Sequence, residues 1–193
     1  MKTIKVADLM IPLSEYATVP DDASLYDAVM ALEKSQENYT YTHSQYRHRA
    51  ILVLDKSKKV IGKISQLDVL RALEPKYAEI LEGRGFQGVG FSKKFLKSML
   101  KDYALFDSAL RDLCRKAAEK PVTKFMHTPG EGEFVSEETT LDQAIHQLII
   151  GHHQSLLVTR GEDIIGIMRL TDVFAALFHM MKECQLEGAG SVD

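Results

Sequence analysis

The feature that most constrains the fold is an internal repeat, because two copies of one unit favour two similar domains. The first parts of the copies match at an offset of 116 residues, in the pairs Met10 and Met126, Val19 and Val135, Leu25 and Leu141, and Ala28 and Ala144. Further along the chain the offset is 104, since residues 60–64 match 164–168 and Asp68 matches Asp172. The first copy therefore carries 12 extra residues, placed near 36–47, which we expect to form an extended polar loop.

Within each copy, local signals predict a strand, a helix, two strands and a closing helix. Ser24 and Thr140 precede apolar patterns with helical spacing and can cap those helices. Short apolar runs at 50–54 and 155–158 are typical of buried strands, and each leads through a polar turn into a second strand. Short strands alternating with helices predict an α/β unit in which helices cover a small sheet.

These patterns divide the chain into parts. We expect a first repeat domain at 1–74, a helical insertion at 75–120, a second repeat domain at 121–185 and a C-terminal tail at 186–193. Apolar residues in the insertion recur at helical spacing and predict two amphipathic helices, about 92–101 and 106–119. Their apolar faces either pack on the repeats or on each other, or they form a dimer or partner surface.

Composition excludes several classes of function. The formal net charge of −3 and the pI near 6.2 lack the basic footprint of a phosphate-tracking surface, so no nucleic acid partner is expected. No apolar run reaches the length of a membrane span, so no membrane association is expected. Cys114 and Cys184 stand in apolar, helical-looking surroundings, which predicts buried thiols in a reducing compartment and a cytoplasmic protein.

Motifs for catalysis or metal binding are weak. Gly83 to Gly88 spells G-x-G-x-x-G, but a helical pattern precedes it where a dinucleotide site needs a strand, so we interpret it as a loop. The histidines have no zinc-type partners at diagnostic spacing, and the two cysteines are remote, so we expect no metal. A nucleophile elbow, a Walker loop and a kinase signature are all missing from the sequence, so we expect no enzymatic activity.

The repeat resembles one known family. The segments Asp8 to Pro12 and Thr18 to Asp21, followed by Gly62-x-Ile64-Ser65-x-x-Asp68, follow the sequence pattern of the CBS (cystathionine-beta-synthase) domain family in its usual order. The resemblance covers about 6–73 and 122–181. It implies an α/β fold of two β-α-β-β-α units about a pseudo-twofold axis, with two clefts between them, and commonly a homodimer of such pairs. Clefts of this family typically take AMP, ADP, ATP or S-adenosylmethionine.

Two acidic positions are the main candidates for a ligand site. Ser65 stands where a strand becomes a helix, and Asp68 can accept hydrogen bonds from both hydroxyls of a ribose. The same Ser-x-x-acid pattern can also be a helix cap that needs no ligand. In the second copy Arg169 replaces the serine while Asp172 remains. Arg169 either binds a phosphate or pairs with Asp172, and a degenerate second cleft is the favoured interpretation.

The family resemblance adds further candidates. It implies contacts to adenine from the first strand, at Ala17, Thr18 and Val19, and places Ile64 beside the same cleft. Arg49 either reaches a ligand phosphate or is a solvated charge at a strand edge. We therefore expect a stand-alone sensor of an adenosine compound that acts on an unidentified effector protein. The first alternative is a dimeric scaffold with vestigial clefts, and the second is an enzyme of an unfamiliar kind.

Overall fold

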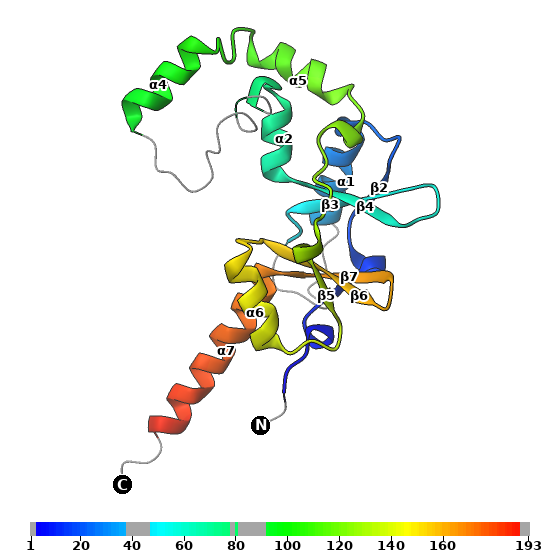
Figure 1. Ribbon diagram of the computed structural model, residues 1–193, viewed down its shortest axis with the longest axis vertical. Helices are drawn as coiled ribbons and strands as arrows, with labels where there is room; N and C mark the ends of the chain where they lie inside the picture. Colours follow the sequence, from blue (N-terminus) through cyan, green and yellow to red (C-terminus); the bar gives the residue numbers. More distant parts are fainter. Residues whose placement is uncertain (1–2, 38–46, 78–79, 81–91, 190–193) are drawn as a thin grey trace.

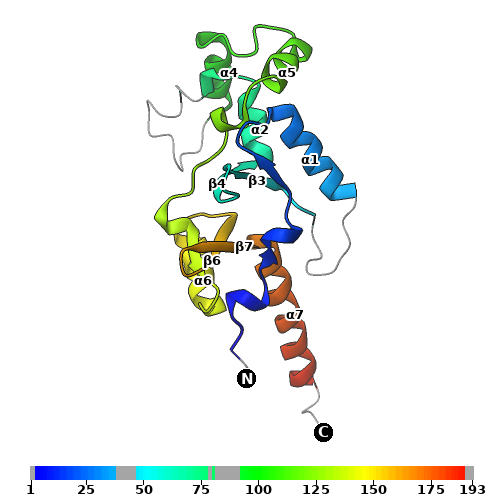
Figure 2. The same ribbon diagram turned by 90° about the vertical axis from the view of Figure 1, so that its right-hand side faces the viewer.

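The computed structural model describes residues 3–37, 47–77, 80 and 92–189. One repeat forms the upper half of Figure 1 and the other forms the lower half, and each half contains one small sheet. The two sheets face each other across the middle of the molecule (Figure 2). Each half has the order β-α-β-β-α, so the predicted α/β fold with paired units is confirmed.

The first half is built from one repeat around its own core. Its elements are β2 (Thr18–Pro20), α1 (Leu25–Glu37), β3 (Ala50–Leu54), β4 (Val60–Ser65) and α2 (Gln66–Ala72). The sheet order is β2-β3-β4, with β2 parallel to β3 and β3 antiparallel to β4. Apolar residues of α1 at helical spacing pack on alternate residues of the strands, which explains the predicted helix and strand periods.

The second half repeats this arrangement with a longer final helix. Its elements are η4 (Glu131–Glu133), β5 (Phe134–Ser136), α6 (Leu141–Ile150), β6 (Ser155–Arg160), β7 (Asp163–Arg169) and α7 (Leu170–Ala189). Again the first strand pairs parallel and the last antiparallel with the central strand. The last helix, α7, has 20 residues and projects beyond the sheet toward the C-terminus (Figure 1).

Each repeat is completed by the segment that precedes the other repeat. We call residues 5–12 and 121–128 the leading segments. The first contains η1 (Val6–Asp8) and β1 (Ile11–Pro12), followed by η2 (Leu13–Glu15), and β1 pairs antiparallel with β7 of the second half. The second contains η3 (Val122–Lys124) and pairs at His127 with Lys63 of β4. Val6 is buried in the core of the second half and Val122 in that of the first.

This exchange explains one glycine in each copy. A Cβ on Gly62 would lie 2.5 Å from the sulfur of Met126, and a Cβ on Gly166 would lie 2.5 Å from the carbonyl oxygen of Ile11. Both distances are shorter than any ordinary contact of a side chain. Glycine therefore lets each leading segment cross closely over the last strand of the opposite sheet.

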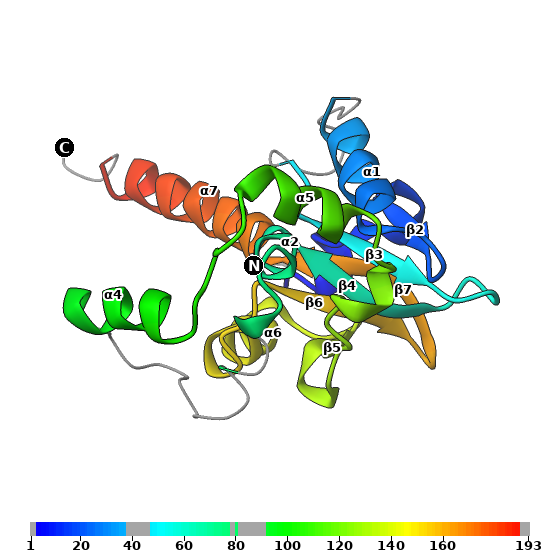
Figure 3. The same ribbon diagram turned by 90° about the horizontal axis from the view of Figure 1, so that it is seen from above.

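The insertion contains the two expected amphipathic helices, α4 (Lys93–Asp102) and α5 (Leu110–Ala118). Ser92 caps α4, with its Oγ accepting from the Phe95 amide at 3.1 Å. The second helix begins four residues after the predicted Phe106, because the backbone turns there with a φ of 58°. α5 packs on α1, whereas none of the residues of α4 is fully buried and α4 lies to one side (Figure 3).

The prediction for the two cysteines needs correction, and the predictions for two loops fall on residues that the structure does not describe. Cys114 and Cys184 are both exposed, so the prediction of buried thiols is wrong. A helical pattern does not say which helix face is covered. The predicted loops at 38–46 and at Gly83 to Gly88 lie outside the described residues. Within the described chain, the helices are too short or too polar to cross a membrane.

Candidate functional site

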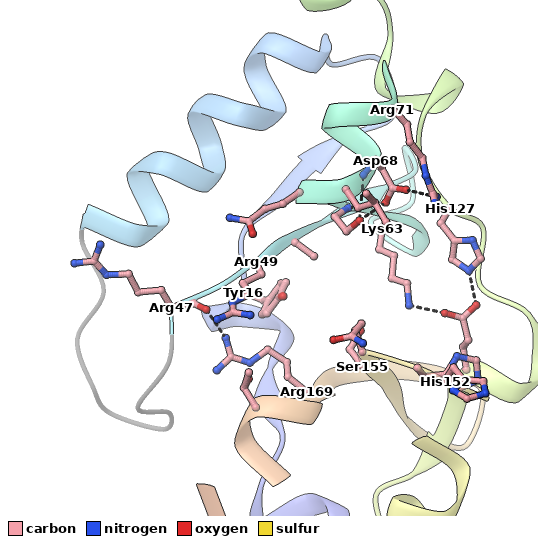
Figure 4. Close-up of a pocket in the computed structure, with 18 residues that line it drawn as sticks. Tyr16, Arg47, Arg49, Lys63, Asp68, Arg71, His127, His152, Ser155 and Arg169 are labelled. Carbon is pink, nitrogen blue, oxygen red and sulfur yellow. Dashed lines mark hydrogen bonds and ion pairs between the residues drawn. The ribbon is translucent and has the colours of Figure 1, made fainter. Parts of the chain in front are cut away.

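A cavity of about 590 Å³ lies between the two halves and is lined by both repeats (Figure 4). This volume is within the usual range for small-molecule sites. Most of its charged and imidazole side chains are basic: Arg47, Arg49, Lys63, Arg71, His127, His152, His153 and Arg169, against the acids Asp68 and Glu133. The cavity can therefore receive an anionic ligand, with Asp68 as an acceptor for hydroxyl groups.

Ser65 and Asp68 form a complete helix cap at the start of α2. The Ser65 hydroxyl and amide donate to Asp68 Oδ2 at 2.6 and 2.8 Å, and the Asp68 amide donates back to Ser65 Oγ at 3.3 Å. Ser24 and Asp27 form the same cap at the start of α1, outside the cavity lining. The cap alternative is thus realised in the structure, although only Asp68 of these two aspartates also lines the cavity.

In the second half, Arg169 pairs with Asp172. The guanidinium donates to the two carboxylate oxygens at 2.6 and 2.7 Å, and the two residues are only 5% and 7% exposed. A third bond joins Arg169 Nη1 to the carbonyl oxygen of Arg47 at 3.2 Å. Of the two alternatives for Arg169, the structure shows pairing with Asp172, and Asp172 itself does not line the cavity.

Tyr16 and His48 surround this buried pair. Their rings meet edge to face, with centroids 4.4 Å apart. Burial raises the pKa of Tyr16 to about 12, although the charge of Arg169 opposes this rise, and Asp172 adds a smaller increase. Burial and the nearby charge of Arg169 lower the pKa of His48 to about 4. Both rings are therefore neutral at pH 7.

The buried imidazole predicts a pH dependence of stability. Because the pKa of His48 is about 4 in the folded chain and 6.5 when unfolded, the unfolded state binds more protons between these values. The free energy of unfolding should fall as the pH drops through this window, with a loss of about 1–2 kcal/mol from His48 by pH 5. Urea denaturation at pH 7 and pH 5 measures this loss of stability.

Two variants test whether His48 causes the loss. His48→Phe should reduce it, whereas His146→Gln, at an exposed position on α6, should leave it unchanged. Equal losses in the wild type and in both variants would show that His48 is not the cause.

A second group of charges lies at the other side of the cavity. The Glu133 carboxylate accepts hydrogen bonds from Lys63 Nζ and from the Gly130 amide at 3.1 Å, and lies 2.5 Å from His127 Nε2. Burial opposes the charged form of Glu133, but the hydrogen bonds from Lys63, His127 and Gly130 outweigh it and lower its pKa to about 2. Since Lys63 belongs to β4 and Glu133 to η4, this ion pair joins the two halves.

The structure brings four of the nine expected site residues to the cavity, namely Arg49, Ser65, Asp68 and Arg169. The other five do not line it: Val19 and Ile64 belong to the first core, Ala17 packs against that core, Thr18 pairs with Leu52, and Asp172 pairs with Arg169. The first-strand residues thus do not line this cavity, and their expected contacts with adenine stay a prediction. The exchange of leading segments brings Tyr16, just before that strand, to Arg169 instead.

Sequence reasoning missed Lys63, His127 and Glu133. At the repeat offsets, Lys63 matches Ile167, His127 matches Ile11 and Glu133 matches Ala17. The replacement of three apolar residues by charged or titratable ones is a signal that a comparison of the two copies could have found. Among the residues that the structure describes, no three His, Cys, Asp or Glu side chains come together as a metal site would require.

Known proteins provide the final comparison. No curated protein sequence matches this chain. Three similar solved structures are CBSX2 in complex with AMP (20% identity, 91% of this chain and 97% of that chain, TM-score 0.57), the putative acetoin utilization protein AcuB from Vibrio cholerae (20%, 96% and 98%, 0.58), and a CBS domain-containing protein of unknown function from Bacillus anthracis (21%, 91% and 94%, 0.53). At these identities the likeness shows the fold alone. The CBS domain model matches residues 6–75 and 121–179, more than half of the chain, and the chain therefore belongs to the CBS-domain family as a tandem pair.

Proposed function

We propose that this chain is a regulatory, non-catalytic module that binds an adenosine compound, such as AMP, ADP, ATP or S-adenosylmethionine, between its two CBS domains. The observation that carries the proposal is the cavity shared by both domains, in which the carboxylate of Asp68 lies among several cations. A nucleotide presents the complementary groups, a ribose diol and an anionic phosphate. The AMP complex of CBSX2, which has the same fold, supports this ligand class.

The helix cap at Ser65 is compatible with this role. A carboxylate has two oxygens and about four acceptor positions. The cap uses Oδ2 of Asp68, while the contact of Oδ1 with Arg71 is long, at 3.4 Å. Oδ1 thus retains the capacity to accept from a ribose hydroxyl, and Arg49 from the same cavity can contact a phosphate.

The second half supports binding of one ligand per chain. There the guanidinium of Arg169 already occupies both oxygens of Asp172, the position equivalent to Asp68. A ribose would have to displace a buried bidentate ion pair. Binding at the Asp68 side alone would then favour one relative pose of the two domains, and the change of pose would alter contact with an effector protein.

The test is a titration of the whole chain with adenosine, AMP, ADP, ATP and S-adenosylmethionine. At least one compound should give a calorimetric binding isotherm with one site per chain. That compound should also raise the melting temperature, since a ligand at 100 times its Kd stabilises the folded state by about 2.7 kcal/mol. Absence of binding and of any melting shift at millimolar concentrations of all five compounds would overturn the proposed function.

Exposed apolar side chains support a second function, assembly of a homodimeric scaffold. They lie on helices of both domains: Tyr26, Val29 and Met30 on α1, Leu67 and Leu70 on α2, Ile149 and Ile150 on α6, and Phe174, Phe178 and Met181 on α7. The insertion adds Leu96 and Leu100 on α4. So many exposed large apolar groups are typical of an interaction surface. Assembly and ligand sensing are compatible, and the titration above decides whether the cavity has a role.

We expect light scattering to report a dimer or a larger assembly, formed through these helices and partly through α4 and α5. Phe174→Asp should shift the mass toward the monomer, because a buried unpaired carboxylate opposes association. Ser57→Asp, at an exposed position in the turn between β3 and β4 and outside these helices, is the matched control and should leave the mass unchanged. A wild-type monomer at high concentration with full stability would remove this claim.

A further inference from the structure

The two halves differ at one set of equivalent positions. In the second half, Ile11 pairs with Ile167, and both belong to the apolar cluster between the sheets. At the equivalent positions of the first half, His127 pairs with Lys63. Backbone hydrogen bonds of 2.8 and 3.0 Å join these two residues, so the fold makes the same crossing with either pair. The pair Ile11 and Ile167 therefore shows that this crossing of a leading segment over a strand does not need charged side chains.

The carboxylate of the group also replaces an apolar residue. Glu133 occupies the position of Ala17, lines the cavity, and contacts Lys63 and His127 through its carboxylate. The side chains of Lys63 and Glu133 are only 14% and 8% exposed. Removing a lysine and a carboxylate from water is costly, and an ion pair of this kind is often no more stable than apolar residues of similar volume. Stability of the fold does not explain why these charges replaced the apolar set.

We propose that the Glu133 carboxylate is a built-in competitor that occupies an anion site formed by Lys63 and His127, and that a phosphate group of the ligand displaces it. Of the adenosine compounds proposed above, the ligand is thereby narrowed to those that carry at least one phosphate group. Adenosine has no group for this site. S-adenosylmethionine offers a carboxylate beside an ammonium group, a poorer match to two donors than a phosphate. This narrowing rests on the proposed function, whereas the anion site itself does not.

Displacement of Glu133 would also connect the ligand to the pose of the domains. His127 is held to β4 by the two backbone hydrogen bonds, so it stays with the first domain when the ligand enters. Glu133 belongs to η4, which leads into β5 of the second domain. Its bond to Lys63 therefore joins the two domains, and a phosphate that takes its place releases that connection.

The test uses inorganic tripolyphosphate, which carries no nucleoside, in calorimetric titrations of the whole chain. Glu133→Gln removes the competing charge and keeps the shape, so it should bind at least tenfold more tightly than the wild type. Lys63→Met should bind at least tenfold more weakly than the wild type or not at all. Glu137→Gln removes a partly buried carboxylate that pairs with Arg160 outside the cavity lining, and should leave the affinity unchanged. Equal or weaker binding by Glu133→Gln, or no binding by either protein, overturns the proposal.

Two additions keep the outcome decisive. Melting curves show whether each variant is folded, and if Glu133→Gln is not, Glu133→Asp takes its place. Its shorter side chain competes less well for Lys63, so its affinity for tripolyphosphate should also exceed that of the wild type. The proposed function can fail alone, when no adenosine compound binds but Glu133→Gln gains affinity for tripolyphosphate. The anion site can fail alone, when a nucleotide binds but the variant and the wild type bind tripolyphosphate equally.

Discussion

Asp68→Ala is expected to weaken the binding of an adenosine compound by about 1–3 kcal/mol, roughly a 5- to 150-fold rise in Kd. The reason is the loss of a charged acceptor for the ribose hydroxyls within the cavity between the domains. Calorimetric titration with the compound that binds most tightly to the wild type measures the change. Asp172→Ala should affect affinity less, because Asp172 is already paired with Arg169 and does not line the cavity.

The cap at the start of α1 provides the matched control for this experiment. Asp27 makes with Ser24 the same three hydrogen bonds that Asp68 makes with Ser65. Asp68→Ala should therefore lower the free energy of unfolding by about 1 kcal/mol, and Asp27→Ala should lower it as well. Only Asp68→Ala should lose ligand affinity. If Asp68→Ala binds as tightly as the wild type, Asp68 is a cap alone and the proposed site is wrong.

Arg169→Met should lower the free energy of unfolding by about 3–5 kcal/mol. The substitution leaves the Asp172 carboxylate buried without its guanidinium, and it removes the bond to the carbonyl oxygen of Arg47. Methionine fills much of the same volume, so the loss reports mainly the uncompensated charge rather than a void. Urea denaturation at pH 7 gives the value from the midpoint and slope.

Two further variants separate burial from pairing. Arg115→Met breaks an ion pair with Asp112 at the same spacing of three residues, but on the exposed surface of α5, and should cost less than about 1 kcal/mol. The double variant Arg169→Met with Asp172→Leu removes both buried charges and should recover most of the lost stability. A cost for Arg169→Met no larger than that for Arg115→Met would show that the buried pair contributes nothing specific.

The internal repeat was sufficient to predict the fold class and the order of the elements. Helix and strand periods are local, so the core positions Leu25 and Leu141 could be recognised directly from their neighbours. The cap at Ser24 could be predicted for the same reason. At Phe106 the local pattern failed, because the Phe106 amide donates to the distant Glu74 carboxylate and the chain turns there instead of forming helix.

What only the tertiary structure decided is which parts of the two repeats meet. The leading segments exchange partners, and this pairing joins residues more than 60 positions apart, which no local period encodes. The exchange brings Tyr16 to Arg169 and brings Glu133 to Lys63, and so determines which charges face the cavity. The sequence by itself could name Ser65, Asp68 and Arg169 as candidates, since each belongs to a motif. It could not show that Arg169 is bound to Asp172. A free guanidinium ready for phosphate and a guanidinium paired with Asp172 are equally compatible with the local sequence, and only the burial and the neighbours of Arg169 in the folded chain distinguish them.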